Sequence, residues 1–212
     1  TLQRWNEGQI YPENYTYKYP KAGTANYKIK IFVYDIQTNN TIQVVIGSET
    51  DIYIPRMQWT KESNLLSIVW LNRLQNHMKI LHVDIDKMES NIVYEEKSKT
   101  FIDTNFCDDL IYLNNKKHFV LSSEKDGYKH LYRYNMDGSL VNQITKGNWE
   151  VDELTAIEEN TNKLFYLSKE NTPLNTSFYE VGIDGDNKKL LSPNEGTTSI
   201  NMSPDSKYYI SY

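Results

Sequence analysis

Two pairs of adjacent glutamates are the residues of this chain best suited to binding a cation. Glu95-Glu96 and Glu158-Glu159 each place two carboxylates side by side, and such a pair can hold an ammonium group through charge-assisted hydrogen bonds. Lys97 and Lys99 follow the first pair closely, and the second pair lies in a polar turn. Both contexts favour solvated surface carboxylates over a cation site.

The histidines do not have the spacing of a metal site. A helical zinc site needs two histidines four residues apart, and no two histidines here are placed in that way. A structural role is therefore favoured for all of them, and His130 is expected to anchor a hairpin. The histidines are His77, His82, His118 and His130.

A possible calcium-binding loop and a possible nucleophilic cysteine each lack a residue that their chemistry needs. Asp84 and Asp86 open like a calcium-binding loop, but Glu89 stands where that loop needs glycine. Cys107 could be a nucleophile, yet no basic residue stands near it in the sequence, so an inert, half-buried thiol is favoured. The sequence thus predicts no metal site, no cofactor and no catalytic residue in this chain.

Three tryptophans could form a carbohydrate-binding surface. Trp59, Trp70 and Trp149 fall in or beside predicted strands. Aromatic side chains at such positions usually pack between neighbouring sheets. Packing is therefore the favoured interpretation, and a glycan-binding surface is the alternative.

These residues belong to a strand pattern that recurs about every fifty residues. Its copies end at positions 35, 84, 135 and 182, which are 49, 51 and 47 residues apart. Two shorter apolar stretches precede each of the later copies, as Cys107–Leu113 and His118–Glu124 precede the copy that ends at 135. One apolar stretch follows every copy, often after a polar turn. Asp137-Gly138 and Asp184-Gly185 are strong hairpin signals, because type I′ turns need residues that tolerate positive φ. A repeat of this length with four strands indicates propeller blades.

The chain is predicted to be all-β and to form a single, partial β-propeller domain spanning residues 1–212. Its parts are a lead-in and half-blade at 1–46, full blades at 47–97, 98–146 and 147–194, and a half-blade at 195–212. The pattern begins and ends inside a blade, so we expect a piece of a larger protein. Unpaired strand edges promote pairing. We expect the two half-blades to pair, or a homo-oligomer to form through residues 27–36 or 208–212.

Composition limits the possible partners. There are 28 acidic residues against 23 lysines and arginines, a net charge of -5, which disfavours a nucleic-acid partner. No apolar run approaches the roughly 18 residues that a membrane span requires.

Four segments, in this order and spacing, carry a family resemblance. They are Tyr-Lys-Tyr-Pro-Lys-Ala-Gly at 17–23, Trp-Leu-Asn-Arg-Leu-Gln-Asn at 70–76, Ser-Glu-Lys-Asp-Gly-Tyr-Lys-His-Leu-Tyr at 123–132 and Ile-Thr-Lys-Gly-Asn-Trp-Glu-Val at 144–151. Together they resemble the β-propeller domain of the dipeptidyl peptidase IV family, in the prolyl oligopeptidase clan of serine peptidases.

The resemblance implies an exported enzyme, in the periplasm or at the surface of a bacterium. Its propeller would precede an α/β-hydrolase domain with a Ser-Asp-His triad, gate the substrate cavity and help to form a homodimer through an arm. The peptide substrate would lose an N-terminal dipeptide with Pro or Ala in second place. No G-x-S-x-G elbow occurs here, and the family's amino-terminus-binding Glu-Glu pair belongs upstream of residue 17. Glu95-Glu96 and Glu158-Glu159 lie in the wrong blades for that role.

One residue of the chain is expected to line the substrate cavity. The resemblance places a Phe-Arg pair where Thr104-Asn105-Phe106 stand here, so Phe106 is the counterpart and the arginine is missing. Two functions follow as hypotheses. The chain is the non-catalytic propeller part of a serine dipeptidyl peptidase, or it is a propeller that binds a protein or peptide without catalysis.

Overall fold

The computed structural model describes residues 2–6, 8, 10–11, 13–193 and 195–212. Every regular element of this described part is a β-strand, so the prediction of an all-β chain is confirmed. None of these residues belongs to a helix that is long and apolar enough to cross a membrane. Position 194, where a blade was predicted to end, lies outside the described residues.

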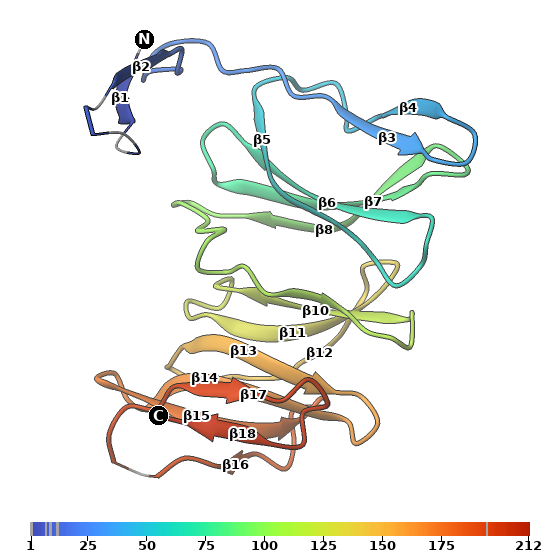
Figure 1. Cartoon of the computed structure of the whole chain (residues 1–212). Coiled ribbons are helices and arrows are strands. Elements are labelled where there is room, and N and C mark those ends of the chain that lie inside the picture. The colour runs from blue at the N-terminus through green and yellow to red at the C-terminus, as the bar shows by residue number, and fades with distance from the viewer. Residues whose placement is uncertain (1, 7, 9, 12, 194) are drawn as a thin grey trace.

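Three four-stranded antiparallel sheets form the body of the molecule, each with its strands in chain order (Figure 1). The first sheet contains β5 (Ile52–Trp59), β6 (Leu65–Asn72), β7 (His77–Asp84) and β8 (Glu89–Lys97). The second contains β9 (Leu110–Tyr112), β10 (His118–Ser123), β11 (His130–Asn135) and β12 (Leu140–Gln143). The third contains β13 (Val151–Glu158), β14 (Lys163–Thr172), β15 (Asn175–Gly182) and β16 (Lys189–Leu190).

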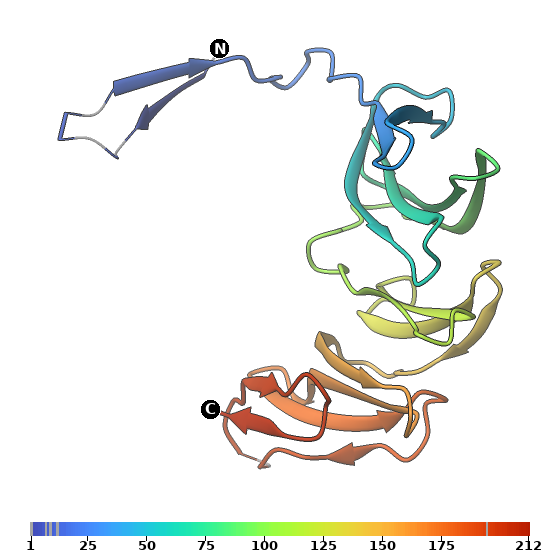
Figure 2. The ribbon, with the colours of Figure 1, turned by 45° about the vertical axis from the view of Figure 1, so that its right-hand side comes forward.

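A two-stranded sheet flanks this body at each end. β3 (Ile31–Asp35) pairs with β4 (Asn40–Val44) before the first full sheet, and β17 (Ile200–Met202) pairs with β18 (Tyr209–Ser211) after the third. Figure 2 shows the sheets stacked face to face along an arc, with the first strand of each full sheet on the concave side. This is the predicted arrangement of full blades and half-blades in an incomplete propeller.

A hairpin near the N-terminus was not predicted. β1 (Leu2–Asn6) pairs with β2 (Glu13–Tyr17) and extends away from the stacked sheets (Figure 2). Most of β2 is exposed, and the rings of Tyr15 and Tyr17 stack on each other at 5.7 Å. A strand without a buried face leaves no alternation of apolar and polar residues to detect, which is why the sequence pattern missed it.

The core lies between successive sheets rather than inside any one of them. The second strand of each full sheet is buried on both faces, so Ile68, Phe119 and Leu164 are fully buried. One apolar cluster joins the first and second sheets, and another joins the second and third. Complete burial of such a side chain stabilises the fold by roughly 1.5–3 kcal/mol, so each sheet depends on its neighbours.

The two Asp-Gly turns form the predicted hairpins but not through type I′ geometry. Only the glycines have positive φ, 89° at Gly138 and 91° at Gly185. The amide of Gly138 donates to Asn135 O at 2.9 Å, and Asn135 donates to Ser139 O, which is a type I turn followed by a glycine bulge. Gly138 also meets the preceding sheet, since a Cβ there would lie 2.1 Å from Val93 O.

A buried histidine links the first two sheets. His82 Nε2 lies 2.8 Å from the hydroxyl of Tyr112, which lies 2.7 Å from Ser67 Oγ. Burial lowers the pKa of His82 to about 4, although a hydrogen bond to the Met136 backbone acts in the opposite direction. The neutral ring is therefore the form that the folded protein holds.

Replacement of Gly138 by alanine should destabilise the protein more than replacement of Gly127. Gly127 also has positive φ, at 95°, but nothing surrounds the added Cβ. Gly127→Ala should cost about 1–2 kcal/mol of backbone strain. Gly138→Ala should cost roughly 1–3 kcal/mol more, because the two sheets must separate. Denaturant unfolding measures both losses, and equal losses would contradict the close approach of the sheets.

Acid should destabilise the protein through His82. The unfolded imidazole takes up a proton near its ordinary pKa of 6.5, whereas the folded ring resists protonation down to about 4. The free energy of unfolding should therefore fall between these pH values, by about 3 kcal/mol in total. The free energy of unfolding of His82→Gln should lack this fall. Unfolding curves measured from pH 7 to pH 4 for both proteins test the difference. Parallel pH profiles for the two proteins would show that His82 does not cause the effect.

Candidate functional site

The segment that joins the first full sheet to the second carries Phe106, the residue expected to line a cavity. It runs from the end of β8 at Lys97 to the start of β9 at Leu110. The connection therefore returns from the last strand of one sheet to the first strand of the next, on the concave side of the arc. Phe106 is half-buried near the end of this connection.

A tight turn fixes the backbone around Phe106. Asp103 Oδ1 accepts hydrogen bonds from the amides of Asn105 and Phe106, at 2.9 and 3.1 Å, and the carbonyl of Asp103 accepts from Cys107 at 2.8 Å. Aspartate favours such turns because its short side chain can bond to the backbone two residues further on. The strand expected from Cys107 onward therefore begins only at Leu110, which corrects that prediction.

A buried lysine lies against this turn. Lys129, 2% exposed, places Nζ 4.8 Å from the centre of the Phe106 ring and 3.0 Å from Asp109 Oδ2. It also donates to the carbonyl of Asp152 in the third sheet, at 3.1 Å. Apart from this ion pair, Asp109 Oδ2 has no partner among the described residues. The ammonium therefore compensates this buried oxygen. The lysine thereby connects the turn to two sheets.

Several carboxylates surround the pair. Burial raises the pKa of Glu124, and the negative charges of Glu150 and Asp103 raise it further. The pKa of the Cys107 thiol rises to about 12, chiefly through burial and then through Glu124. The thiol therefore stays protonated at neutral pH and is a poor nucleophile, in agreement with the inert role predicted for it.

The two glutamate pairs do not form cation sites. Glu95 bonds to His77 Nε2 at 2.6 Å and lies 3.4 Å from Lys97 Nζ, whereas Glu96 accepts from Tyr94 at 2.5 Å and from Ser123 at 2.7 Å. The neighbouring carboxylates thus point to different partners. The interpretation of Glu95-Glu96 as a surface pair holds for Glu95 only, because Glu96 lies in a bonded network between sheets.

The second pair also makes structural contacts. Glu158 accepts hydrogen bonds from the amides of Asn160 and Thr161, which closes its own turn. Glu159 accepts from the amides of Asn114 and Asn115 in the second sheet, at 2.7 and 3.2 Å. This carboxylate therefore holds two sheets together and is not available to a ligand.

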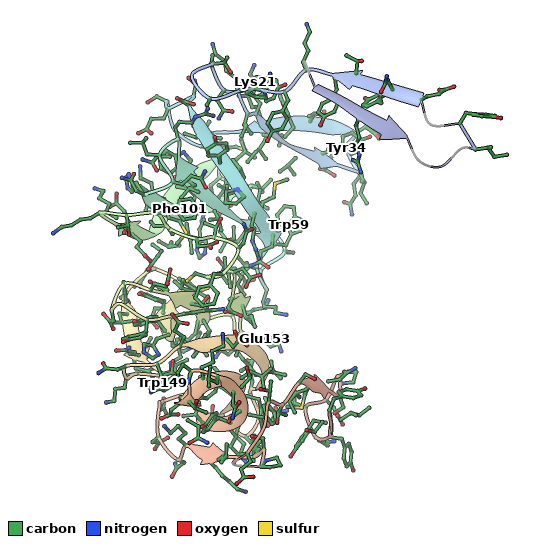
Figure 3. All side chains as sticks on the ribbon, turned by 90° about the vertical axis from the view of Figure 1, so that its left-hand side faces the viewer. Lys21, Tyr34, Trp59, Phe101, Trp149 and Glu153 are labelled. Carbon is green, nitrogen blue, oxygen red and sulfur yellow. The ribbon has the colours of Figure 1, made fainter. Side chains whose placement is uncertain are left out.

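The histidines and tryptophans also behave as structural residues. His130 contacts Thr145 Oγ1 at 3.1 Å and Gly147 O at 2.9 Å, so it anchors the chain beside its hairpin as predicted. No group of metal-binding side chains occurs among the residues that the structure describes. Trp70 is 2% exposed, and Figure 3 shows Trp59 and Trp149 on different sides of the stack. The three indoles therefore share no exposed surface.

Comparison with known proteins places these sheets in a family. The model of the dipeptidyl peptidase IV (DPP IV) N-terminal region matches residues 2–212. This chain belongs to the dipeptidyl peptidase IV N-terminal family. The crystal structure of Porphyromonas gingivalis dipeptidyl peptidase 4 superposes with a TM-score of 0.88 and 33% identity, covering 99% of this chain and 30% of that one. The predicted partial β-propeller of this family is thereby confirmed.

Other relatives agree on the family, but one of them is named as an inactive protein. Mouse inactive dipeptidyl peptidase 10 is 28% identical over 191 residues, and Trichophyton rubrum dipeptidyl peptidase 4 is 26% identical over 188 residues. These matches cover 84% and 86% of this chain but 24% of each relative, so the chain spans about a quarter of their length. A putative dipeptidyl aminopeptidase IV from Bacteroides ovatus, 22% identical with a TM-score of 0.81 over 99% of this chain and 32% of that one, shares the fold.

Sequence patterns did not single out Lys129 or Arg56 as site residues. Lys129 stands 20 residues after Asp109, and Arg56 contacts Asp108 from a distance of 52 residues along the chain. Neither spacing belongs to a known motif. Lys129 did lie within one of the segments that carry the family resemblance, and this was the only signal.

Removal of the buried ammonium should destabilise the protein strongly. Lys129→Met leaves the carboxylate of Asp109 buried without a compensating charge, so the free energy of unfolding should fall by about 3–5 kcal/mol. Lys116→Met is the matched control, since the Lys116–Glu62 ion pair is about half exposed and should contribute only about 0–1 kcal/mol. Chemical denaturation measures both losses. Similar losses would mean that the buried ammonium stabilises the fold no more than an exposed one does.

Proposed function

We propose that this chain is the non-catalytic propeller part of an exported serine dipeptidyl peptidase. The complete enzyme removes dipeptides with Pro or Ala in second place from peptides that have a free amino terminus. The observation that carries the proposal is the match of 99% of the chain to Porphyromonas gingivalis dipeptidyl peptidase 4 at 33% identity. The propeller shapes and gates the substrate cavity, and the bond chemistry belongs to an α/β-hydrolase domain.

In this proposal Phe106 is the cavity residue of the chain. Its ring is half-buried, its backbone is fixed by Asp103, and one of its faces lies against the ammonium of Lys129. A ring held in this way can offer an apolar contact to a peptide at little cost in conformational entropy. The periplasm or the cell surface is the proposed location.

The same proposal includes self-association. Tyr11 and Ile10 in the loop between β1 and β2 are 83% and 93% exposed, and the hairpin extends away from the sheets (Figure 2). Large exposed apolar side chains often mark a protein interface. A second copy of the complete protein is the proposed partner, with the β1–β2 hairpin as the arm.

A second function is favoured by one of the relatives. The mouse protein at 28% identity is named an inactive dipeptidyl peptidase. A propeller of this family can therefore belong to a protein that lacks the activity, and a scaffold that binds a protein or peptide is the alternative function for this chain.

Peptidase activity of the complete protein separates the two functions. The complete protein should cleave Gly-Pro and Ala-Pro amides, should leave N-acetyl-Gly-Pro amide intact, and should lose its activity to a serine-directed inhibitor. The 212-residue chain alone should show no turnover. Release of the fluorescent amine is the measurement. No cleavage by the complete protein would favour the scaffold, and turnover by the chain alone would refute the non-catalytic role.

A further inference from the structure

An arginine of the first full sheet reaches across to the turn that carries Phe106. Arg56 lies on β5, the strand of that sheet on the concave side of the arc. Its Nη1 donates to the carbonyl of Asp108 and to Asp108 Oδ2, both at 3.2 Å, and its Nη2 donates to the carbonyl of Thr104 at 3.2 Å. One guanidinium thus bonds to the backbone on both sides of Phe106.

Ile102, the residue before the turn, also contacts the first sheet. Its amide donates to Gln75 O at 2.8 Å, and its side chain belongs to the apolar cluster that includes Val69. A cleft of about 390 Å³ separates β5 from the segment and is lined by Met57, Val69 and Leu110, among others. Gln58 Nε2 donates to Leu110 O at 3.0 Å, but this contact lies beyond the turn, at the start of β9. Arg56 therefore holds the turn itself, at Thr104 and Asp108, whereas the other two contacts hold the chain before and after it.

The turn is held from the other side by the next blade. Lys129 lies over the Phe106 ring and bonds to the third sheet through Asp152 O. The two cations approach the same turn from different directions, and Asp103 keeps its backbone compact between them. The position of the Phe106 ring is therefore set by contacts to three successive sheets.

We infer that Arg56 is a positioning residue for the substrate cavity, acting through Phe106. The guanidinium is suited to this role because its planar fork can donate to two carbonyl groups and a carboxylate together, which a lysine ammonium cannot do in the same geometry. The inference rests on the proposed function for its substrate, a peptide with a free amino terminus. The holding of the turn by Arg56 does not depend on that function.

Hydrogen exchange of the complete protein tests the holding of the turn. Arg56→Gln should speed exchange of the Asn105, Phe106 and Cys107 amides by about fivefold or more, because local opening becomes easier. Lys116→Gln is the matched control. Lys116 lies in the turn before β10 and contacts Glu62 in the turn before β6. The substitution therefore removes a cation–carboxylate contact between the same two sheets, away from Phe106. Unchanged exchange in Arg56→Gln, or an equal change in Lys116→Gln, would overturn the inference.

Kinetics of the complete protein test the action through Phe106. Arg56→Gln should raise KM for Gly-Pro amide by about fivefold while kcat stays within twofold, because substrate binding rather than the transition state alone is affected. Arg56→Lys should recover part of the loss. Phe106→Ala should raise KM similarly, and the double variant should be no worse than Phe106→Ala. Additive losses, or a fall in kcat alone, would refute the positioning role.

The exchange and kinetic experiments together also separate this inference from the proposed function. If the wild-type protein cleaves neither Gly-Pro nor Ala-Pro amide, the proposed function fails. In that case, faster amide exchange in Arg56→Gln than in the wild type would still support the holding of the turn, and unchanged exchange would overturn it. If the wild-type protein is active and Arg56→Gln changes neither KM nor exchange, the inference fails while the function stands.

Discussion

Mutual burial of sheet faces is the constraint on which the rest of this structure depends. A sheet whose middle strand is apolar on both faces, as β10 is around Phe119, cannot be stable alone in water. It requires a neighbour on each side, and each neighbour has the same requirement. The arc of stacked sheets is the result (Figure 2). The turns and loops are placed by this stacking, including the one that carries Phe106.

The stacking buries some polar groups between sheets, and three of these groups have specific partners. His82 bonds to Tyr112, Glu159 accepts from two backbone amides, and Lys129 compensates Asp109. A buried polar group costs free energy unless it is bonded. These contacts therefore fix how one sheet sits on the next, because a shift of the sheets would leave the groups without partners. Apolar burial drives the association, and the polar contacts select one arrangement.

The sequence revealed what is periodic and apolar, and little else. The strands of the three full sheets were found because their apolar residues recur at a nearly constant spacing. The β1–β2 hairpin was missed because β2 has no buried face. A strand was predicted from Cys107 to Leu113, whereas the turn at Asp103 delays its start to Leu110. Phe106 was reached through a family resemblance, whereas Arg56 and Lys129 required the three-dimensional contacts between residues far apart in the chain.

The glycine of each Asp-Gly hairpin bears on the size of the ring. At Gly138 and again at Gly185, the hairpin on the outer side of one sheet touches the backbone of the sheet before it. Contact without a side chain lets successive sheets come closer at the outer rim than a larger residue would permit. A narrower rim spacing reduces the wedge angle between sheets. A smaller angle means that more blades are required to complete a full turn, and that the central opening is wider.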